Sequence, residues 1–257
     1  TVNAPEVTIG AFDATIGIEN VTDMNGGQFD LSFDAGVVNV TGVNAGDIGG
    51  TVIPIVDWRF MDADTIRVLF KLSGADGLSG SGSVAVIGFE LIGSQSDSSV
   101  LDISGGALSD INAGEIPATW ADAGVAIGVP VTVNAPEVVS GAFNATIEIE
   151  NVANMNAGQF DLSFDAGVVN VTDVYDGSID GTTVPLVSWR SMEGKIRVIF
   201  KLSGADGVSG SGSVATIGFA VTGSQGDTSV LDIAEGNLAD TGADEIPATW
   251  ADDEVTV

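Results

Sequence analysis

The sequence predicts an all-β protein made of two tandem antiparallel jelly-roll β-sandwiches. Three observations predict it: a domain-sized internal repeat, short segments in which apolar and polar residues alternate, and clusters of Gly, Asn, Asp and Ser between those segments. Alternation with a period of two is typical of strands that bury one face. Neither repeat contains a long amphipathic helical pattern, so packed antiparallel sheets are the expected architecture.

The repeat divides the chain into two copies of one unit. Residues 27–41 recur without change at 158–172, which is 131 positions later. The offset becomes 130 after a one-residue deletion near residues 61–65. A period of this length is a complete domain rather than a solenoid repeat, so each copy should have its own core. We expect one domain over residues 1–128 and the second over 129–257.

Four segments of the first copy show the alternation most clearly. They are Phe12–Ile18, Phe29–Phe33, Ile66–Leu72 and Ala85–Leu91. In each of them every second residue is apolar, which predicts a half-buried strand whose apolar side chains face the core. The Gly-rich and Asn-rich stretches between them predict turns.

Composition excludes several function classes. The 36 Asp and Glu residues outnumber the 7 Lys and Arg residues, and the net charge of −29 repels nucleic acids and anionic lipids. No apolar run approaches the roughly 18 residues that span a bilayer. Cys and His are absent, which leaves only carboxylate chemistry, and the acids lie on polar strand positions or in turns. We therefore expect no nucleic-acid partner, no membrane insertion, no enzyme activity and no required cofactor.

Four further stretches carry a family resemblance: Ala14–Val21, Gly27–Val38, Thr65–Phe70 and Gly82–Phe89. Their order and spacing resemble the cohesin family across almost all of each copy. The resemblance implies a nine-stranded jelly-roll whose first and last strands lie side by side. It also implies a place among the modules that bind dockerins in cellulosome scaffolds and that occur in bacterial and archaeal surface proteins.

The seven cations occupy matching windows of the two copies, at Arg59, Arg67 and Lys71 and at Arg190, Lys195, Arg197 and Lys201. Arg67 and Lys71 have the parity opposite to Ile66 and Phe70, which predicts that they project from the outer face of one strand. Such a stripe is either a contact for an acidic neighbour or an offset of local repulsion that also protects an edge strand. The interface candidates are Arg59, Arg67, Lys71, Arg190, Arg197 and Lys201.

The end of the chain is a second interface candidate. The first copy lacks the Gly-Val-Pro-Val lead-in that precedes Thr132 in the second copy. We expect the terminal strand of a neighbouring chain, with Val255 and Val257, to cover the exposed edge by β-augmentation. Deletion of residues 254–257 should then abolish polymers and leave each domain folded.

Two sets of polar residues are weaker site candidates. Oxygen ligands that suit Ca²⁺ or another divalent cation lie in turn-like segments at Asp110, Asn112, Glu115, Asp240, Asp244 and Glu245. Solvated turns and diffuse ion binding are the alternatives to an ordered site. Glycosylation sequons begin at Asn20, Asn39, Asn144 and Asn170.

These features lead to a structural function as the first interpretation. We expect an extracellular, cell-surface subunit of a layer, sheath or filament that polymerises with itself, and Thr1 followed directly by strand-like sequence fits a mature end left by signal-peptide cleavage. One alternative is a cohesin scaffold module that binds dockerin-bearing partners. The other is an adhesin for surface glycans, for which Trp58, Trp120, Trp189 and Trp250 would supply stacking surfaces.

Overall fold

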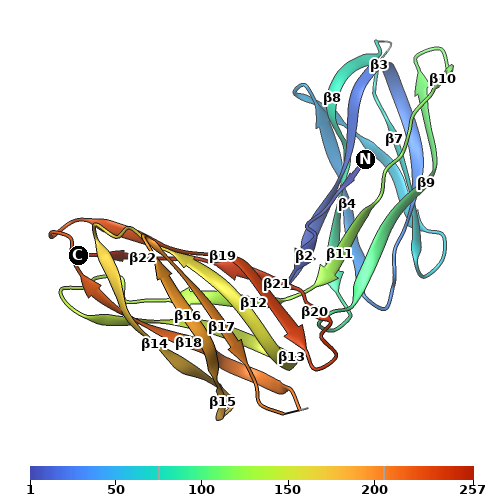
Figure 1. Cartoon of the computed structure of the whole chain (residues 1–257). Helices are drawn as coiled ribbons and strands as arrows, with labels where there is room; N and C mark the ends of the chain where they lie inside the picture. Colours follow the sequence, from blue (N-terminus) through green and yellow to red (C-terminus); the bar gives the residue numbers. More distant parts are fainter. Residues whose placement is uncertain (75, 205) are drawn as a thin grey trace. The chain divides into compact units, whose positions relative to one another are not determined.

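The computed structural model describes residues 1–74, 76–204 and 206–257, and only the backbone of Glu235. It confirms the all-β prediction, since the described residues form strands and no helix. The described residues accordingly contain no helix that could span a membrane. The chain forms two compact units, Thr1–Ile127 and Gly128–Val257, each with its own hydrophobic core (Figure 1). The boundary lies one residue before the one expected, because Gly128 belongs to the second unit.

The first unit contains strands β1 to β11. Their bounds are β1 Val2–Asn3, β2 Val7–Thr8, β3 Phe12–Ser32, β4 Val38–Ile48, β5 Thr51–Ile53, β6 Ile55–Phe60, β7 Thr65–Lys71, β8 Leu78–Leu91, β9 Ser98–Asp110, β10 Glu115–Ile116 and β11 Ala123–Ile127. Three of these strands, β1, β2 and β10, are only two residues long, whereas β3 is long enough to act as a strand in each of two sheets. The number of segments therefore need not equal the nine strands that the resemblance implies.

Strand β3 takes part in both layers of the first unit. Its first half pairs with β1 and β8, and its second half pairs with β7 and β9. The change of layer occurs where the register shifts and where Asn20 and Asp23 have positive φ angles of 51° and 53°. The amides of these two residues donate to the hydroxyls of Ser81 and Ser79, both at 2.9 Å, so the bend leaves neither amide unsatisfied.

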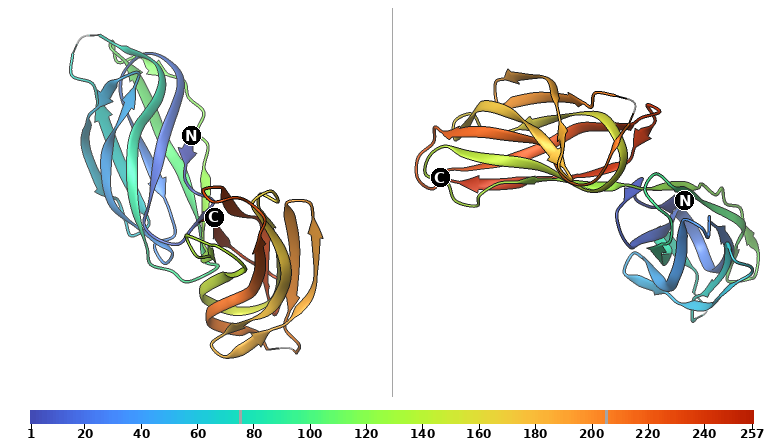
Figure 2. Two further views of the ribbon diagram at one scale, coloured as in Figure 1. Left: turned by 90° about the vertical axis from the view of Figure 1, so that its left-hand side faces the viewer. Right: turned by 90° about the horizontal axis from the view of Figure 1, so that it is seen from below.

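Two layers result, and Figure 2 shows them from two further sides. One layer contains β5, β4, β8, the first half of β3 and β1. The other contains β6, β7, the second half of β3, β9, β11 and β2. The predicted alternation is confirmed by burial, because Phe29, Leu31 and Ile66 are fully buried between the layers.

The second unit repeats this plan. Its strands are β12 Val129–Asn134, β13 Phe143–Ser163, β14 Val169–Ile179, β15 Thr182–Val184, β16 Leu186–Met192, β17 Lys195–Lys201, β18 Val208–Val221, β19 Thr228–Asp240, β20 Glu245–Ile246, β21 Ala248–Ala251 and β22 Asp253–Thr256. Strand β13 pairs with β12 and β18 and then with β17 and β19, as β3 does in the first unit.

The first and last strand regions of each unit lie side by side, as the resemblance implies. Strand β2 runs parallel to β11 in the first unit, and β12 runs parallel to β21 in the second. Parallel pairing of this kind joins the beginning of a unit to its end and closes the sandwich.

The terminal strand is already part of the second unit, which corrects the expectation that Val255 and Val257 serve a neighbouring chain. Strand β22 pairs with β19, and Val255 is fully buried in the core of its own unit. The Thr256 amide donates to the Glu137 carbonyl at 2.9 Å, and the Val257 amide donates to the Asp227 carbonyl at 2.9 Å. Strand β22 therefore closes its own unit, and the Val255 side chain is not available to a neighbour.

Candidate interaction face

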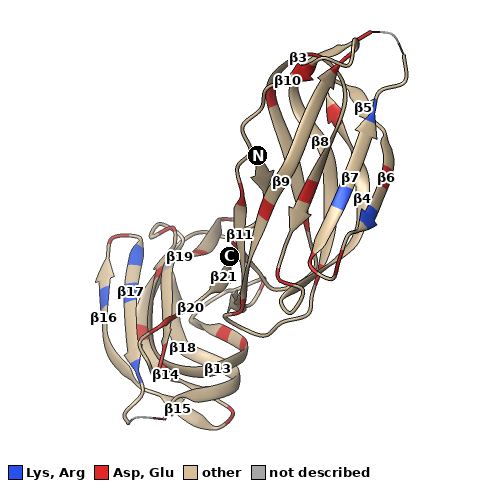
Figure 3. Cartoon of the chain, turned by 90° about the vertical axis from the view of Figure 1, so that its right-hand side faces the viewer, with Lys and Arg blue, Asp and Glu red and all other residues tan. Residues whose placement is uncertain are grey.

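Every Lys and Arg of the chain lies on one pair of neighbouring strands in its unit, β6 and β7 in the first and β16 and β17 in the second (Figure 3). We call the outer surface of these strands and the adjoining β3 or β13 the cationic face. In the first unit it comprises Asp30, Val56, Asp57, Arg59, Arg67, Leu69 and Lys71. In the second it comprises Asp161, Val187, Ser188, Arg190, Lys195, Arg197, Ile199 and Lys201.

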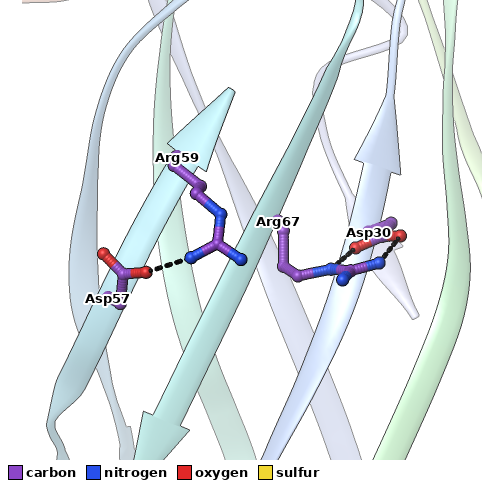
Figure 4. Close-up of polar contacts among 4 residues, drawn as sticks. All are labelled: Asp30, Asp57, Arg59 and Arg67. Carbon is purple, nitrogen blue, oxygen red and sulfur yellow. Dashed lines mark hydrogen bonds and ion pairs between the residues drawn. The ribbon is translucent and has the colours of Figure 1, made fainter. Parts of the chain in front are cut away.

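A bidentate ion pair lies at the centre of the first cationic face. Strand register places Asp30 of β3 opposite Arg67 of β7, and the Arg67 Nε and Nη2 atoms each lie 2.7 Å from one carboxylate oxygen of Asp30 (Figure 4). These hydrogen bonds from the Arg67 guanidinium hold the pKa of the Asp30 carboxyl below its usual range, although burial opposes the shift. A planar fork of this kind holds both side chains in one geometry.

A second ion pair lies beside it at the edge of the sheet. Arg59 Nη1 of β6 lies 2.8 Å from the Asp57 carboxylate, and both side chains are exposed (Figure 4). Because water and salt screen such a pair, it contributes little to stability, and both groups stay available to a partner.

The second cationic face carries more positive charge. Asp161, whose side chain is only 1% exposed, binds Arg197 through two hydrogen bonds of 2.6 and 2.8 Å and also forms an ion pair with Lys195. Ser188 replaces Asp57, so Arg190 has no matching carboxylate on its own strand. The first face therefore combines three cations with two carboxylates, whereas the second combines four cations with one.

The interface predictions need a partial correction. Arg67 and Arg197 do project outward, as their parity predicts, but each is tied to a carboxylate of its own unit. Each arginine thereby offsets a local negative charge, as the alternative interpretation describes, and a contact with a partner stays a prediction. Asp30 and Asp161 were missed because sequence alone does not show which strand lies next to β7 or β17, although their polar parity within the Phe-Asp-Leu motif marked them as outward-facing.

A shallow apolar hollow adjoins the ion pairs of the first unit. It measures roughly 350 Å³ and is lined in part by Val56, Leu69 and Ala107. Val56 is 63% exposed, and its counterpart Val187 in the second unit is 62% exposed. In protein interfaces, apolar residues of this kind contribute affinity when a partner buries them, and neighbouring charges orient the partner.

The predicted metal ligands lie in turns whose backbone amides already donate hydrogen bonds to the Asp110 and Asp240 carboxylates. The Asp110 carboxylate accepts the amides of Asn112 and Gly114 at 2.8 and 2.7 Å. Asp240 accepts the amides of Gly242 and Asp244 at 2.7 and 3.0 Å. Glu115 and Glu245 are exposed and begin the short strands that follow. Within the described ranges, no three acidic side chains converge in a manner suited to a metal ion.

The sequons and the tryptophans lie in different environments. Asn20, Asn144 and Asn170 are exposed, whereas Asn39 is half-buried and donates to Glu90 at 2.9 Å. Glycosylation of these positions stays a prediction.

Trp58, Trp120 and Trp250 pack against the cores, and Trp189 is 37% exposed.

Comparison with known proteins assigns the family. The cohesin domain model matches residues 1–127 and again residues 113–257, which together cover the whole chain. The chain belongs to the cohesin domain family. Its two units are therefore cohesin domains in tandem, in agreement with the resemblance that the sequence motifs indicate.

Individual relatives are distant. The chain is 28% identical over 238 residues to cellulose-binding protein A of Clostridium cellulovorans, and the match covers 85% of this chain but only 12% of that protein. Among solved structures, a type II cohesin dyad from the ScaA scaffoldin of Acetivibrio cellulolyticus is 15% identical, with a TM-score of 0.39 and coverage of 100% of this chain and 98% of that one. A non-cellulosomal cohesin of Archaeoglobus fulgidus is 19% identical, with a TM-score of 0.44 and coverage of 50% and 90%.

One further neighbour was solved with a partner. The sixth cohesin of scaffoldin B of Acetivibrio cellulolyticus, in complex with a mutant Cel5 dockerin, is 15% identical and covers 51% of this chain and 99% of that one, with a TM-score of 0.43.

Proposed function

We propose that this chain is an extracellular, non-catalytic scaffold segment in which each cohesin domain holds a dockerin-like domain of a partner protein. The observation that carries the proposal is the cationic face, which occurs once in each cohesin domain and joins an ordered guanidinium group to exposed apolar side chains. Membership of the cohesin family supports a protein ligand. The cationic face offers charged groups and exposed apolar side chains that such a ligand can contact.

The charge distribution supports a partner with an acidic patch. The chain is strongly acidic as a whole, and its few cations lie on these faces alone. An approaching domain with an acidic patch is attracted to this face and repelled elsewhere, which orients the encounter. The exposed Val56 and Val187 side chains then provide apolar area that a docked domain can bury.

The structural-layer interpretation has lost one of its contacts. It placed assembly on sandwich edges, on complementary charge and on a terminal strand that joins a neighbouring chain, and strand β22 instead pairs with β19 of its own unit. We therefore prefer capture of a partner domain to self-assembly through addition of the terminal strand.

The test is retention of dockerin domains by the intact chain. A panel of recombinant dockerin domains in Ca²⁺-containing buffer is passed over immobilised chain, and binding is quantified by calorimetry. We expect at least one dockerin to be retained, and we expect the double variant V56D/V187D to weaken binding more than tenfold, since burial of a carboxylate at an interface is unfavourable.

A matched control lies on the opposite layer. Val52 of β5 is 59% exposed, almost the same as Val56, so V52D introduces the charge of the V56D substitution at a position away from the cationic face. Binding by V52D should equal that of the parent chain. Retention of no dockerin by the parent chain, together with polymer formation in sedimentation velocity, would contradict the proposal and favour the self-assembling subunit.

A further inference from the structure

The first unit has an open sheet edge along strand β6. Within residues 1–74 and 76–127, β6 pairs with β7 and with no other strand, so β6 ends its layer. The Met61 amide donates to the Thr65 carbonyl at 2.8 Å, which marks these two residues as a hydrogen-bonded pair. Such pairs alternate along an antiparallel ladder, so the peptide groups of Arg59 face β7, whereas those of Trp58 and Phe60 face the open edge.

The charged side chains of this edge are arranged symmetrically about Trp58. Asp57 precedes it, Arg59 follows it, and both charged side chains are exposed (Figure 4). When two copies of β6 lie antiparallel with their Trp58 residues opposite each other, each Asp57 lies opposite Arg59 of the other copy. Residues 57 and 59 then form a non-hydrogen-bonded pair, in which facing side chains are closest. The edge is therefore complementary to a second copy of itself.

Aromatic side chains lie on the other face of the same edge. Trp58 packs against the core of its unit, and Phe60 is exposed beside it, with ring centroids 6.0 Å apart. Residues two apart in a strand share a face, so these rings alternate with the charged side chains. In the antiparallel pairing the rings of both copies become diagonal neighbours, which buries apolar area on the face opposite to the ion pairs.

The second unit has an open edge of different chemistry. Strand β16 pairs with β17 and with no other strand in residues 128–204 and 206–257. Ser188 takes the place of Asp57, and Ser191 takes the place of Phe60. The edge of β16 therefore keeps the cation, Arg190, but has neither the carboxylate nor the second ring that a further copy of the edge would contact.

Charge complementarity distinguishes the three ways in which two such edges can pair. Pairing of β6 with β6 brings together two Asp57–Arg59 pairs between the copies. Pairing of β6 with β16 gives one ion pair, because Arg190 meets Asp57 while Arg59 meets Ser188. Pairing of β16 with β16 gives none, because each Arg190 meets a serine. The β6 edge therefore fits the same edge of a second copy best.

We propose that two copies of this chain associate through their β6 strands into a dimer with two-fold symmetry. The pairing replaces water at the peptide groups of Trp58 and Phe60 with backbone hydrogen bonds and joins the β6 layers of the two copies into one sheet. A two-fold contact uses the β6 edge of both copies, so it closes and does not extend into a layer or filament. The outer surfaces of β7 and β3 stay open, so the dimer is compatible with the proposed function and does not depend on it.

The local charge permits two acidic chains to meet at this edge. The chain carries a net charge of −29, but the cationic face of the first unit combines Arg59, Arg67 and Lys71 with only two carboxylates. Repulsion between two chains is therefore weaker here than at their acidic surfaces. At a salt concentration of about 0.15 M, exposed charges more than about 8 Å apart are largely screened, whereas partly buried ion pairs are screened less.

Sedimentation velocity of the intact chain tests the proposal. The parent, D57R and R59D are measured at about 0.15 M salt over a concentration series that reaches about 1 mM, since small contacts are weak. We expect the parent to show a monomer–dimer equilibrium. Each variant should lose at least about tenfold in dimer affinity, because D57R brings four arginine side chains together and R59D brings four carboxylates together. An equimolar mixture of D57R and R59D should regain the dimer, because each strand then meets the opposite charge.

R190D is the matched control, since it makes the same charge change as R59D on the open edge of β16 and should dimerise like the parent. The mixture also controls for folding, because only folded variants can restore each other's contact. A parent that stays monomeric over the whole series, or a mixture that dimerises no better than either variant alone, would overturn the proposal. The solutions contain no dockerin, so this outcome is distinguishable from a failure of the proposed function.

Discussion

Two equivalent carboxylates, Asp30 and Asp161, show how burial changes the energetic role of one ion pair. Both accept a bidentate arginine from the neighbouring strand, but the Asp30 side chain is 19% exposed and the Asp161 side chain is 1% exposed. After loss of the arginine, the Asp30 carboxylate can turn to water, whereas the buried Asp161 carboxylate cannot and keeps its ion pair with Lys195. The cost of breaking the pair should therefore differ between the two units.

Substitution of the arginines measures this difference. We expect R197M to destabilise the second unit by about 2 kcal/mol and R67M to destabilise the first unit by less, since Met retains much of the apolar stem while the charge-assisted hydrogen bonds are lost. Urea unfolding followed by hydrogen exchange, resolved for each unit, provides the measurement. The exposed R190M variant is the control and should stay within about 0.5 kcal/mol of the parent. Equal losses in R67M and R197M would show that the remaining ion pair with Lys195 offsets the effect of burying the Asp161 carboxylate.

The Asp30 pair also predicts a pH dependence. The pKa of Asp30 is lower in the folded chain than its ordinary value, so the unfolded state binds the proton more readily. The stabilisation is fully present above the ordinary Asp pKa of about 3.9 and is lost as the pH falls through the lower folded pKa. Between about pH 5 and pH 2, the first unit of the parent should lose more stability than that of D30N, as measured by urea unfolding at each pH. Parallel profiles for the two proteins would rule out this linkage.

Among the elements, the terminal strand differs most from its sequence-based interpretation. The alternation of Val255 and Val257 indicates a strand but does not say which edge it joins. The structure joins β22 to β19, and the Thr256 carbonyl accepts the Val139 amide at 2.8 Å. The strand therefore closes its own unit.

Deletion of residues 254–257 should consequently destabilise the second unit by about 3 kcal/mol or more, since a fully buried valine and several backbone hydrogen bonds are lost. The first unit should keep its stability, because its core contains none of these residues. Hydrogen exchange of each unit is the measurement, and E254Q, which changes an exposed side chain, is the control. An unchanged second unit after the deletion would restore the original expectation of a free strand.

For the whole molecule, duplication is the main organising feature. Each unit has its own core and its own cationic face, and its long strand, β3 or β13, pairs with equivalent neighbours. The copies nevertheless differ in the charge of the cationic face, with three cations in the first unit and four in the second. Under the proposed function the two faces are related but unequal binding surfaces, and we expect an acidic partner to prefer the second.

Much of this organisation could be predicted from the sequence alone. The repeat length indicates two domains, and the alternation around Phe29 and Ile66 indicates which side chains form the cores, because a strand that buries one face must alternate. Outward projection of Arg67 follows from the same rule. Because Cys and His are absent, the sequence predicts a binding surface and not a catalytic site.

Tertiary structure decided which residues meet. Pairing of Asp30 with Arg67 and closure of the second unit by Val255 both depend on which strands become neighbours and in which register. Local patterns determine the two faces of a strand, but strand neighbours are chosen by contacts between residues far apart in the chain. That choice is made only when both layers pack together.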